Sequence, residues 1–360
     1  MMSAAKTTTG LLHSRLAAQH LASVKAANPH AAVTRLLAVQ AQDYNAALWA
    51  IGLRADAGSA AEVEAAISAR RIVRTWPMRG TLHFVAAEDV RWLQALLAPR
   101  AQARNDARHE REYGLDAKVL KHCRQVLERV LRDGEPVPRP ALYQALEAAG
   151  IATASSRGLH ILYRLAHEGL ICQGPRLGRQ PSFVWLDAWL PPAASSPPSR
   201  EEALSELARR YLLGHGPATA QDLAWWSGLT LKDSQAALRG SGAQAFESDD
   251  TPYWRSQEAT GSATGAKQDV LLLPAFDEYL LGYKDRTPVL DAEHHRKVFT
   301  INGIIQPCVI VADRVAGIWP RSQSEAFEPT LFRGLRAPET RAMQAAAKRH
   351  ACFWSNPGPL

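Results

Sequence analysis

Two glutamines and an aspartate lie inside an otherwise apolar stretch near the N-terminus, Leu36-Leu37-Ala38-Val39-Gln40-Ala41-Gln42-Asp43. Buried polar side chains cost free energy unless they are hydrogen-bonded, so the two amides need a local partner, a ligand or a water. On an extended or bent backbone, residues i and i+2 point to the same side, which would let Gln40 and Gln42 converge on one polar target. Taken alone, these residues favour a simpler interpretation, in which Gln42 or Asp43 caps a helix from Tyr44 to about Leu53.

A second group of side chains that could do chemistry lies in the segment that reads RTWPMRGTLH. One interpretation is a basic wing along DNA, with Arg74, Arg79 and His83 near the backbone and Trp76 or Met78 wedged against bases. The other interpretation is a packed hairpin in which His83 lies in the core. The segment alone favours neither.

Two further groups give weaker signals. Arg157, His160 and Arg164 are spaced i, i+3 and i+7, so they share one face of a predicted helix. That face would either contact phosphate or be solvated, and solvation is the more frequent outcome for such residues. The run 273–286, which reads LPAFDEYLLGYKDR, mixes acids, aromatics and bases. We predict an internal, salt-bridged corner there in preference to a loop that faces nucleic acid.

The elements that position these residues form a repeated unit: two helices, a third basic helix, and a short strand pair. A helix-turn-helix followed by a two-stranded ribbon is a winged helix. The middle copy is the clearest, and a Pro/Ala/Ser-rich linker over 191–200 separates it from the next. In the middle copy we predict helices over 119–131, 139–149 and 155–169 and strands over 170–172 and 182–186, around a basic turn at 174–180.

The other copies are less regular. For the third we predict helices over 201–213, 219–227 and 230–238 and a wing strand over 252–254. For the first we predict helices within 20–54 and over 61–70, then a ribbon over 72–85 that turns near Met78-Arg79-Gly80.

From Asp269 the pattern changes to short apolar runs with a period of two residues, which is typical of strands. Turn signals at Asn302-Gly303 and Asp313-Arg314 separate these runs, and we predict a small β-barrel closed by a helix over 338–350. The fold class is therefore α+β, with tandem winged-helix (helix-turn-helix) domains followed by a small C-terminal β-barrel. The predicted domains are 8–115, 116–190 and 200–262 for the three winged helices, and 265–355 for the barrel with its closing helix.

Composition narrows the class of function. The net charge of +7 is carried more by arginine than by lysine, which favours a polyanionic partner because the guanidinium binds phosphate through two hydrogen bonds. The four cysteines, Cys123, Cys172, Cys308 and Cys352, are far apart and indicate a reducing cytoplasm. No signal core, membrane span, metal-ligand pattern, Walker A motif, GxGxxG or GxSxG is found in the sequence. We expect no metal, no cofactor and no membrane association.

Several motifs together resemble the winged-helix DNA glycosylase family of AlkZ-like and YcaQ-like proteins, over roughly residues 10–350. The motifs are 37–43 (LAVQAQD), 78–83 (MRGTLH), 273–279 (LPAFDEY), and Gly303 with Ile318-Trp319. The resemblance implies tandem winged helices plus a C-terminal barrel around a DNA-binding channel. It also implies monofunctional excision of N7-alkylated purines, in some members including interstrand crosslinks and bulky adducts. Gln40-Ala41-Gln42 matches the Gln-apolar-Gln motif of the AlkZ-like branch, which implies that Gln40 and Gln42 are catalytic.

The chemistry of such a lesion fits glutamine. An N7-alkylated purine is already positively charged, so its glycosidic bond needs no acid. A glutamine carbonyl cannot act as a base near neutral pH, but it can orient water and place a negative dipole beside a cationic sugar. We therefore expect Gln40 and Gln42 to act together and Asp43 to cap the following helix.

The expected partner is double-stranded, damaged DNA, bound by a monomer located in the bacterial cytoplasm and associated with the nucleoid. The alternative function is a non-catalytic winged-helix DNA-binding protein or transcription regulator, although a regulator has no need of two inward glutamines in a DNA-facing cleft. A scaffold role is disfavoured by the basic charge. The predicted DNA contacts are Arg74, Arg79, His83, Arg157, Arg164, Arg176 and Arg179.

Overall fold

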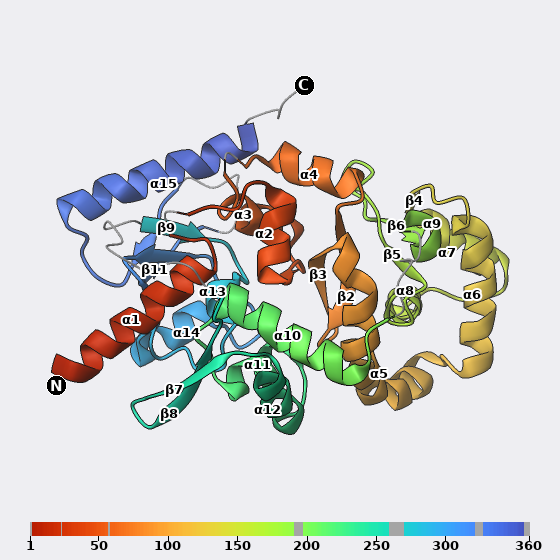
Figure 1. The fold of residues 1–360 in the computed structure, drawn as a ribbon. Coiled ribbons are helices and arrows are strands. Elements are labelled where there is room, and N and C mark those ends of the chain that lie inside the picture. Colours follow the sequence, from red (N-terminus) through yellow and green to blue (C-terminus); the bar gives the residue numbers. More distant parts are fainter. Residues whose placement is uncertain are drawn as a thin grey trace. The chain divides into compact units, whose positions relative to one another are not determined.

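The computed structural model describes residues 2–22, 24–56, 58–190, 197–258, 270–320 and 327–355 (Figure 1). Most of the predicted linker and the start of the predicted C-terminal domain therefore lie outside the described residues. The chain divides into two compact units, which are described separately below. Unit 1 comprises Met1–Val63 with Leu204–Leu360, and unit 2 comprises Glu64–Ala203.

Unit 2 is built on antiparallel strands in the order β3-β2-β5-β6-β4. Its strands are β2 (Ile72–Met78), β3 (Thr81–Ala86), β4 (Val137–Pro138), β5 (Ile171–Gln173) and β6 (Ser182–Trp185). Its helices are η1 (Ala87–Asp89), α5 (Val90–Tyr113), α6 (Ala117–Leu131), α7 (Arg139–Ala148), α8 (Arg157–His167) and α9 (Leu186–Trp189). The helices and strands predicted within 119–186 are confirmed, as is the hairpin that turns at Arg79-Gly80.

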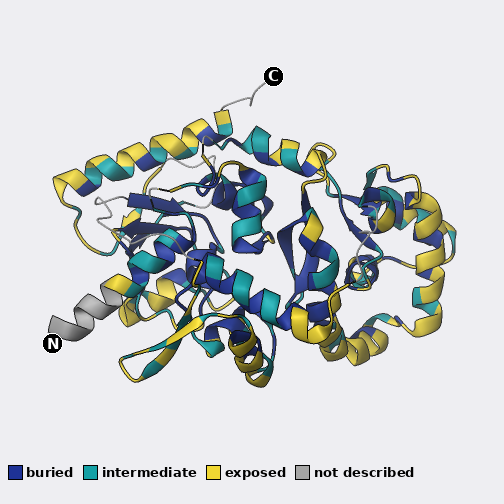
Figure 2. Ribbon diagram, in the orientation of Figure 1, coloured by how far each residue is buried: buried dark blue, intermediate teal, exposed yellow. Residues whose placement is uncertain are grey.

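The core of unit 2 explains why these elements form. Helix α6 begins after Asp116, whose carboxylate accepts a hydrogen bond from the Val119 amide, and its apolar stripe buries Leu127. From the sheet, Trp76 adds its ring to the same core and stacks on Phe183 with 6.5 Å between ring centroids. The opposite face of α6 is exposed (Figure 2). Amphipathic patterning therefore predicted this part of the chain well.

Helix α5 was not predicted. After residue 101 it has few apolar side chains, and Pro99 lies inside it, so the sequence lacks the usual helical pattern. Its C-terminal end is closed by Gly114 in the left-handed conformation. Helix α8 packs against it, as the site residues below show.

Unit 1 contains elements from both ends of the chain. The N-terminal ones are α1 (Met2–Ala18), α2 (Pro29–Leu36), β1 (Ala38–Gln40) and α3 (Tyr44–Gly52), and α4 (Ala60–Ser68) crosses the boundary between the units. Helix α10 (Arg200–His215) crosses back, and α11 (Ala220–Ser227), α12 (Leu231–Gly240) and the hairpin β7 (Gln244–Ser248) and β8 (Thr251–Arg255) follow. The helices predicted for the third copy and its wing strand are confirmed. The second of these helices begins with a capping box formed by Thr219 and Asp222. Helix α1 was not predicted.

The C-terminal strands of unit 1 form an antiparallel sheet in the order β12-β11-β10-β9. Helix α15 packs on this sheet through Ala346, which lies in one apolar cluster with Val270 and Val309 (Figure 1). The described residues show no pairing that closes the sheet into a barrel. The short apolar run Ile304-Ile305 forms no strand and contributes a single bridge between Phe299 and Ile305. The remaining elements are β9 (Val270–Leu273), α13 (Glu278–Leu281), η2 (Ala292–His294), α14 (His295–Val298), β10 (Cys308–Val311), β11 (Arg314–Ile318), β12 (Thr330–Leu331) and α15 (Ala337–Ser355).

In the part of the chain that the structure describes, no helix has the length and apolar character needed to cross a membrane.

Candidate active site

The two glutamines lie at and just beyond the end of β1 in unit 1. Helix α2 ends at Leu36, and Leu37 adopts a positive φ of 66°, which turns the chain from helix into the buried strand. Gln40, the last residue of β1, is 7% exposed, whereas Gln42 is exposed. The Gln42 amide donates a hydrogen bond of 3.2 Å to Oε1 of Gln40. The backbone bends here, so the two side chains meet different surroundings.

Asp43 caps the next helix, as predicted. Its Oδ1 accepts a hydrogen bond of 3.1 Å from the Ala46 amide at the start of α3. The cap satisfies one of the amides that a helix leaves without a partner at its N-terminus. The cap and the glutamine pair are therefore both present, in adjacent positions.

Glu278 holds the backbone of Gln40. The Gln40 amide donates a hydrogen bond of 3.0 Å to Oε1 of Glu278, whose side chain is fully buried at the start of α13. Its other oxygen, Oε2, accepts a hydrogen bond of 2.9 Å from Trp226 Nε1 and lies 3.4 Å from His215 Nε2. A buried carboxylate is tolerated where hydrogen bonds compensate for its lost hydration, and here both oxygens are bound.

Asp277, the preceding residue, makes a separate buried ion pair. Its two oxygens lie 2.7 and 2.8 Å from the guanidinium nitrogens of Arg54, which also donates to Oε1 of Gln19 at 2.8 Å. Both members of the pair are at most 1% exposed. The run 273–286 is therefore an internal, salt-bridged corner, as predicted.

Tyrosines complete this buried polar cluster. Tyr283 donates its hydroxyl hydrogen to the His215 carbonyl at 2.7 Å and accepts a hydrogen bond of 3.2 Å from Gln19 Nε2. Tyr279 donates to the Asp313 carbonyl at 2.8 Å. Burial raises the pKa of both phenols, so they remain neutral donors.

In unit 2, the hairpin β2–β3 is packed inward. Trp76 and Met78 are 5% and 0% exposed, which supports the packed-hairpin interpretation over the one in which either side chain wedges against bases. Arg74 is buried and donates a hydrogen bond of 2.8 Å from Nη1 to Oε1 of Gln173. His83 is buried with Nδ1 3.0 Å from the Thr81 carbonyl oxygen, and Arg79 lies in the turn, where its φ is 53°.

The face shared by Arg157, His160 and Arg164 packs against α5. Arg157 donates to the Tyr113 carbonyl at 2.6 Å, and the His160 ring lies 4.0 Å from the Tyr113 ring centroid. Arg164 is paired with Asp106 and with Glu168. The prediction that this face is solvated is wrong, because α5, which the sequence pattern did not reveal, covers it. Arg157 and Arg164 were both predicted to contact phosphate, and both instead bind groups within unit 2.

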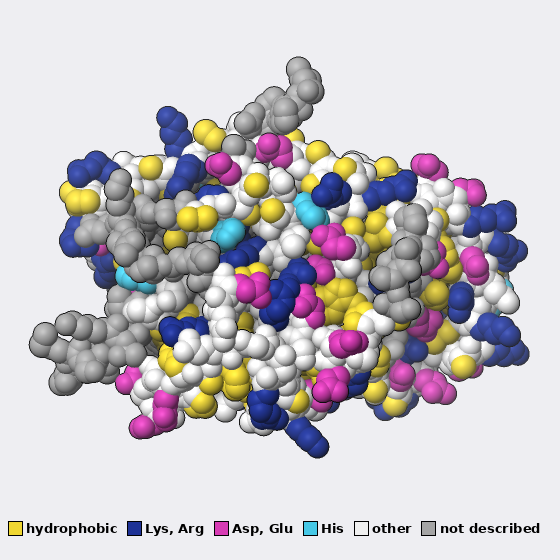
Figure 3. Space-filling view, in the orientation of Figure 1, with side chains coloured by type: hydrophobic (Ala, Val, Ile, Leu, Met, Phe, Trp, Pro, Cys, Tyr) yellow, Lys and Arg dark blue, Asp and Glu magenta, His cyan; other side chains and the backbone are white. Residues whose placement is uncertain are grey.

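Arg176 and Arg179 lie in the connection between β5 and β6. Arg179 is exposed beside Gly178, which has a positive φ, and Arg176 is half-buried. Helix α6, in the same unit, carries Lys118, Lys121, Arg124 and Arg129 against one acidic residue, Glu128. Where Figure 1 places this helix, Figure 3 shows several Lys and Arg side chains at the surface. All seven predicted DNA contacts thus belong to unit 2, whereas Gln40 and Gln42 belong to unit 1.

Sequence reasoning missed Glu278, the partner of Gln40, and the two residues that bind Glu278. Glu278, His215 and Trp226 lie on three elements far from β1 along the chain, and no local pattern connects them to it. One signal was available: adjacent acids inside the apolar run LPAFDEYLL must be satisfied if the run is buried.

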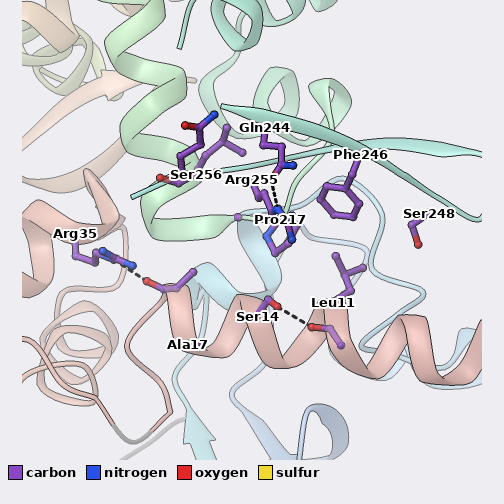
Figure 4. A pocket seen from close by; sticks show the side chains of 15 residues that line it. Leu11, Ser14, Ala17, Arg35, Pro217, Gln244, Phe246, Ser248, Arg255 and Ser256 are labelled. Atoms are coloured by element: carbon purple, nitrogen blue, oxygen red, sulfur yellow. Dashed lines mark hydrogen bonds between the residues drawn. The ribbon is translucent and has the colours of Figure 1, made fainter. Parts of the chain in front are cut away.

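A pocket of about 590 Å³ lies elsewhere in unit 1, between α1, the end of α10 and the β7–β8 hairpin (Figure 4). Its lining includes Arg35, Phe246 and Arg255, and the Nε of Arg255 donates to Gln244 Oε1 at 2.9 Å. Neither Gln40 nor Gln42 lines it, so it is separate from the candidate site. Among the described residues, no group of three or more His, Cys, Asp or Glu side chains is arranged to hold a metal.

The chain is similar to known proteins over most of its length. The sequence model of a family described as "DNA glycosylase AlkZ-like" matches residues 33–353. A curated relative from Streptomyces sahachiroi, named "Interstrand DNA cross-link repair glycosylase", is 27% identical over 307 residues, which cover 80% of each chain. The solved structure of the Streptomyces sahachiroi DNA glycosylase AlkZ superposes with a TM-score of 0.81 at 24% identity and covers 96% of both chains. That likeness shows that the two chains share a mixed α and β fold.

Proposed function

Because this chain belongs to the AlkZ-like DNA glycosylase family, we propose that it excises N7-alkylated purines from double-stranded DNA as a monofunctional hydrolase. The observation that carries the proposal is the placement of Gln42, exposed to solvent, directly beside a buried and hydrogen-bonded Gln40. A DNA-binding regulator does not need a fixed amide next to an accessible one.

In the proposed reaction, the glycosidic bond breaks with both electrons going to the alkylated purine, which becomes neutral as it leaves. The positive charge passes to the sugar. Water then adds to the sugar carbon that carried the base and releases a proton to solvent. Gln42 orients the water through its side-chain carbonyl, and Gln40 turns its amide dipole toward the same point. A carbonyl oxygen has two lone pairs, so Oε1 of Gln40 can accept from the Gln42 amide and still accept a second hydrogen bond.

The substrate range follows from the relative. Its printed name gives crosslink repair as the task of the Streptomyces sahachiroi enzyme, and we propose that this chain also acts on interstrand crosslinks joined through N7 of purines. A crosslinked base cannot rotate freely out of the helix, so the enzyme would reach it within the duplex rather than by complete base flipping.

DNA binding in this proposal uses winged-helix modules. We propose that residues 116–190 and 200–262 are winged helices: the first contains α6, α7 and α8 with the strand pair β5–β6, and the described part of the second contains α10, α11 and α12 with the strand pair β7–β8. Residues 8–115 and a C-terminal barrel over 265–355 are the other proposed domains. The exposed Arg179 and its neighbour Arg176 on the β5–β6 connection are the preferred phosphate contacts. Arg79 and His83 remain secondary candidates, and the internal partners of Arg74, Arg157 and Arg164 favour structural roles. We also propose that the protein acts as a monomer in the nucleoid region of the cytoplasm.

The test is excision from defined duplexes. Gln40→Ala and Gln42→Ala are compared with wild type on DNA that contains N7-methylguanine and on DNA with a nitrogen-mustard crosslink, with abasic sites as the product. We expect each substitution to lower single-turnover excision on the order of 100-fold, while duplex binding changes little. Gln125→Ala, at an exposed glutamine on α6, is the matched control.

Two outcomes would contradict the proposal. If abasic sites form at the wild-type rate in both variants, the mechanism assigned to the glutamines is wrong. If wild type binds DNA but excises neither lesion, the chain is a non-catalytic DNA-binding protein.

A further inference from the structure

We propose that Glu278 is a positioning residue of the glycosylase reaction, which fixes Gln40 and directs negative potential toward the sugar that becomes cationic. This inference rests on the proposed function. It starts from a contact between residues far apart in the sequence: the amide of Gln40 donates to Oε1 of Glu278 at 3.0 Å, across 238 positions.

Glu278 is itself held rigidly. Trp226 Nε1 donates to its Oε2 at 2.9 Å, and His215 Nε2 lies 3.4 Å from the same oxygen. The two partners come from α11 and α10, and both are completely buried, as is Glu278. The carboxylate therefore cannot move without displacing packed aromatic rings, since His215 and Trp226 also lie in contact with each other and with Tyr211.

The constraint passes from Glu278 to both glutamines in two hydrogen bonds. Glu278 fixes the peptide plane of Gln40, and Oε1 of Gln40 in turn accepts from the amide of Gln42. An active site needs its reacting groups held within fractions of an ångström, because a displacement of about 1 Å can cost about 100-fold in rate. A buried carboxylate is a firmer anchor for an amide than a neutral acceptor, because hydrogen bonds to charged groups are shorter and stronger.

The charge of Glu278 also has a direct electrostatic consequence. Arg54 is engaged in a two-point pair with Asp277, so that pair is internally neutral. Glu278 lies one hydrogen bond from the peptide of Gln40 in surroundings of low dielectric, where a charge acts over a longer distance than in water. Its negative potential would favour a sugar that gains positive charge during bond cleavage, and would do so without contacting the DNA.

The experiment replaces the carboxylate by its neutral isostere. Glu278→Gln is compared with Glu339→Gln, which removes a second buried carboxylate of unit 1, one bound by Arg333 and Arg336 at the start of α15. Unfolding midpoints are measured for both variants, and the excision rate at saturating enzyme is measured separately from the dissociation constant for duplex DNA. We expect Glu278→Gln to lower the single-turnover rate about 100-fold, to leave DNA binding unchanged and to retain a folded chain, and we expect Glu339→Gln to excise like wild type.

A second readout does not depend on catalysis. Amide hydrogen exchange of the segment 38–43 should become faster in Glu278→Gln than in Glu339→Gln, because a neutral amide oxygen holds the Gln40 amide less firmly than a carboxylate does, and Oε1 of Gln40, the acceptor of the Gln42 amide, is then less fixed. Should Glu278→Gln fail to fold, Trp226→Phe removes the Nε1 donor while keeping an aromatic ring, and the same two changes are expected at smaller size.

The outcomes separate the two proposals. Equal excision rates and equal exchange in Glu278→Gln and Glu339→Gln would overturn the positioning role even if wild type is active. If Glu278→Gln shows fast exchange at 38–43 but wild type excises no N7 adduct, the anchoring role of Glu278 is supported and the proposed substrate is wrong. If Glu278→Gln does not fold and Trp226→Phe matches wild type in both readouts, the inference is wrong.

Discussion

At the scale of single residues, the Arg54–Asp277 pair shows how a buried charge is compensated by an opposite charge. Both side chains are at most 1% exposed, and two hydrogen bonds of 2.7 and 2.8 Å join them. Removing one partner of such a pair leaves an uncompensated charge in the interior, which costs far more than the pair contributes when it is intact.

We therefore predict that Asp277→Asn lowers the free energy of unfolding by about 3–5 kcal/mol, because Arg54 keeps its charge and loses its counterion. Urea denaturation at neutral pH measures the change. Asp291→Asn is the matched control: Asp291 and its partner Arg314 are 58% and 40% exposed, and the expected loss is below about 1 kcal/mol. Equal losses in the two variants would show that burial does not determine the contribution of these pairs.

At the scale of elements, short segments with strong local signals position the site. Helix α3 begins at Tyr44, directly after its cap Asp43, and the backbone bend that follows β1 ends there. The same carboxylate lies next to the glutamines, so its capping role has to be separated from a chemical one.

Asp43→Asn and Asp43→Ala separate the two roles. Asparagine caps about as well as aspartate, whereas alanine costs about 1 kcal/mol. We predict that Asp43→Asn keeps both stability and excision, and that Asp43→Ala loses stability by this amount, as Asp116→Ala should at the start of α6. Thermal unfolding and single-turnover excision check the two parts. Loss of excision in a fully folded Asp43→Asn would mean that the negative charge itself takes part in the reaction.

At the scale of the whole molecule, histidines in both units are held in their neutral form. Burial lowers the pKa of His20 and His167 from 6.5 to about 4, and it lowers the pKa of His109, His160 and His350 as well. Below pH 6.5 these histidines bind protons in the unfolded chain but not in the folded chain. Their contribution to folding stability is therefore fully present above that pH and is lost as the pH falls.

We predict that the free energy of unfolding falls steadily as pH is lowered from about 6.5 toward 4. Urea titrations at pH 7 and pH 5 measure the loss, and His167→Gln should make it smaller, because that side chain no longer takes up a proton on unfolding. A stability that does not change over this interval, or an unchanged slope in His167→Gln, would show that the histidines titrate alike in both states.

The features that the sequence alone determined are those that depend on local interactions. The amphipathic stripe of α6, the caps at Asp43 and Thr219, the turn of the β2–β3 hairpin and the Gln40-Ala41-Gln42 motif all depend on residues a few positions apart. Such signals can be read from periodicity and capping chemistry, because the interactions that produce them are themselves short in sequence.

Only the tertiary structure decided which of these residues face inward and what they meet there. The burial of Trp76, the packing of the Arg157–Arg164 face on α5, and the Glu278 carboxylate beneath Gln40 all depend on contacts between segments far apart in the chain. A polar side chain has many candidate partners of the right chemistry, and packing selects among them. For this reason the sequence located the glutamine pair, and the fold supplied the charge that holds it.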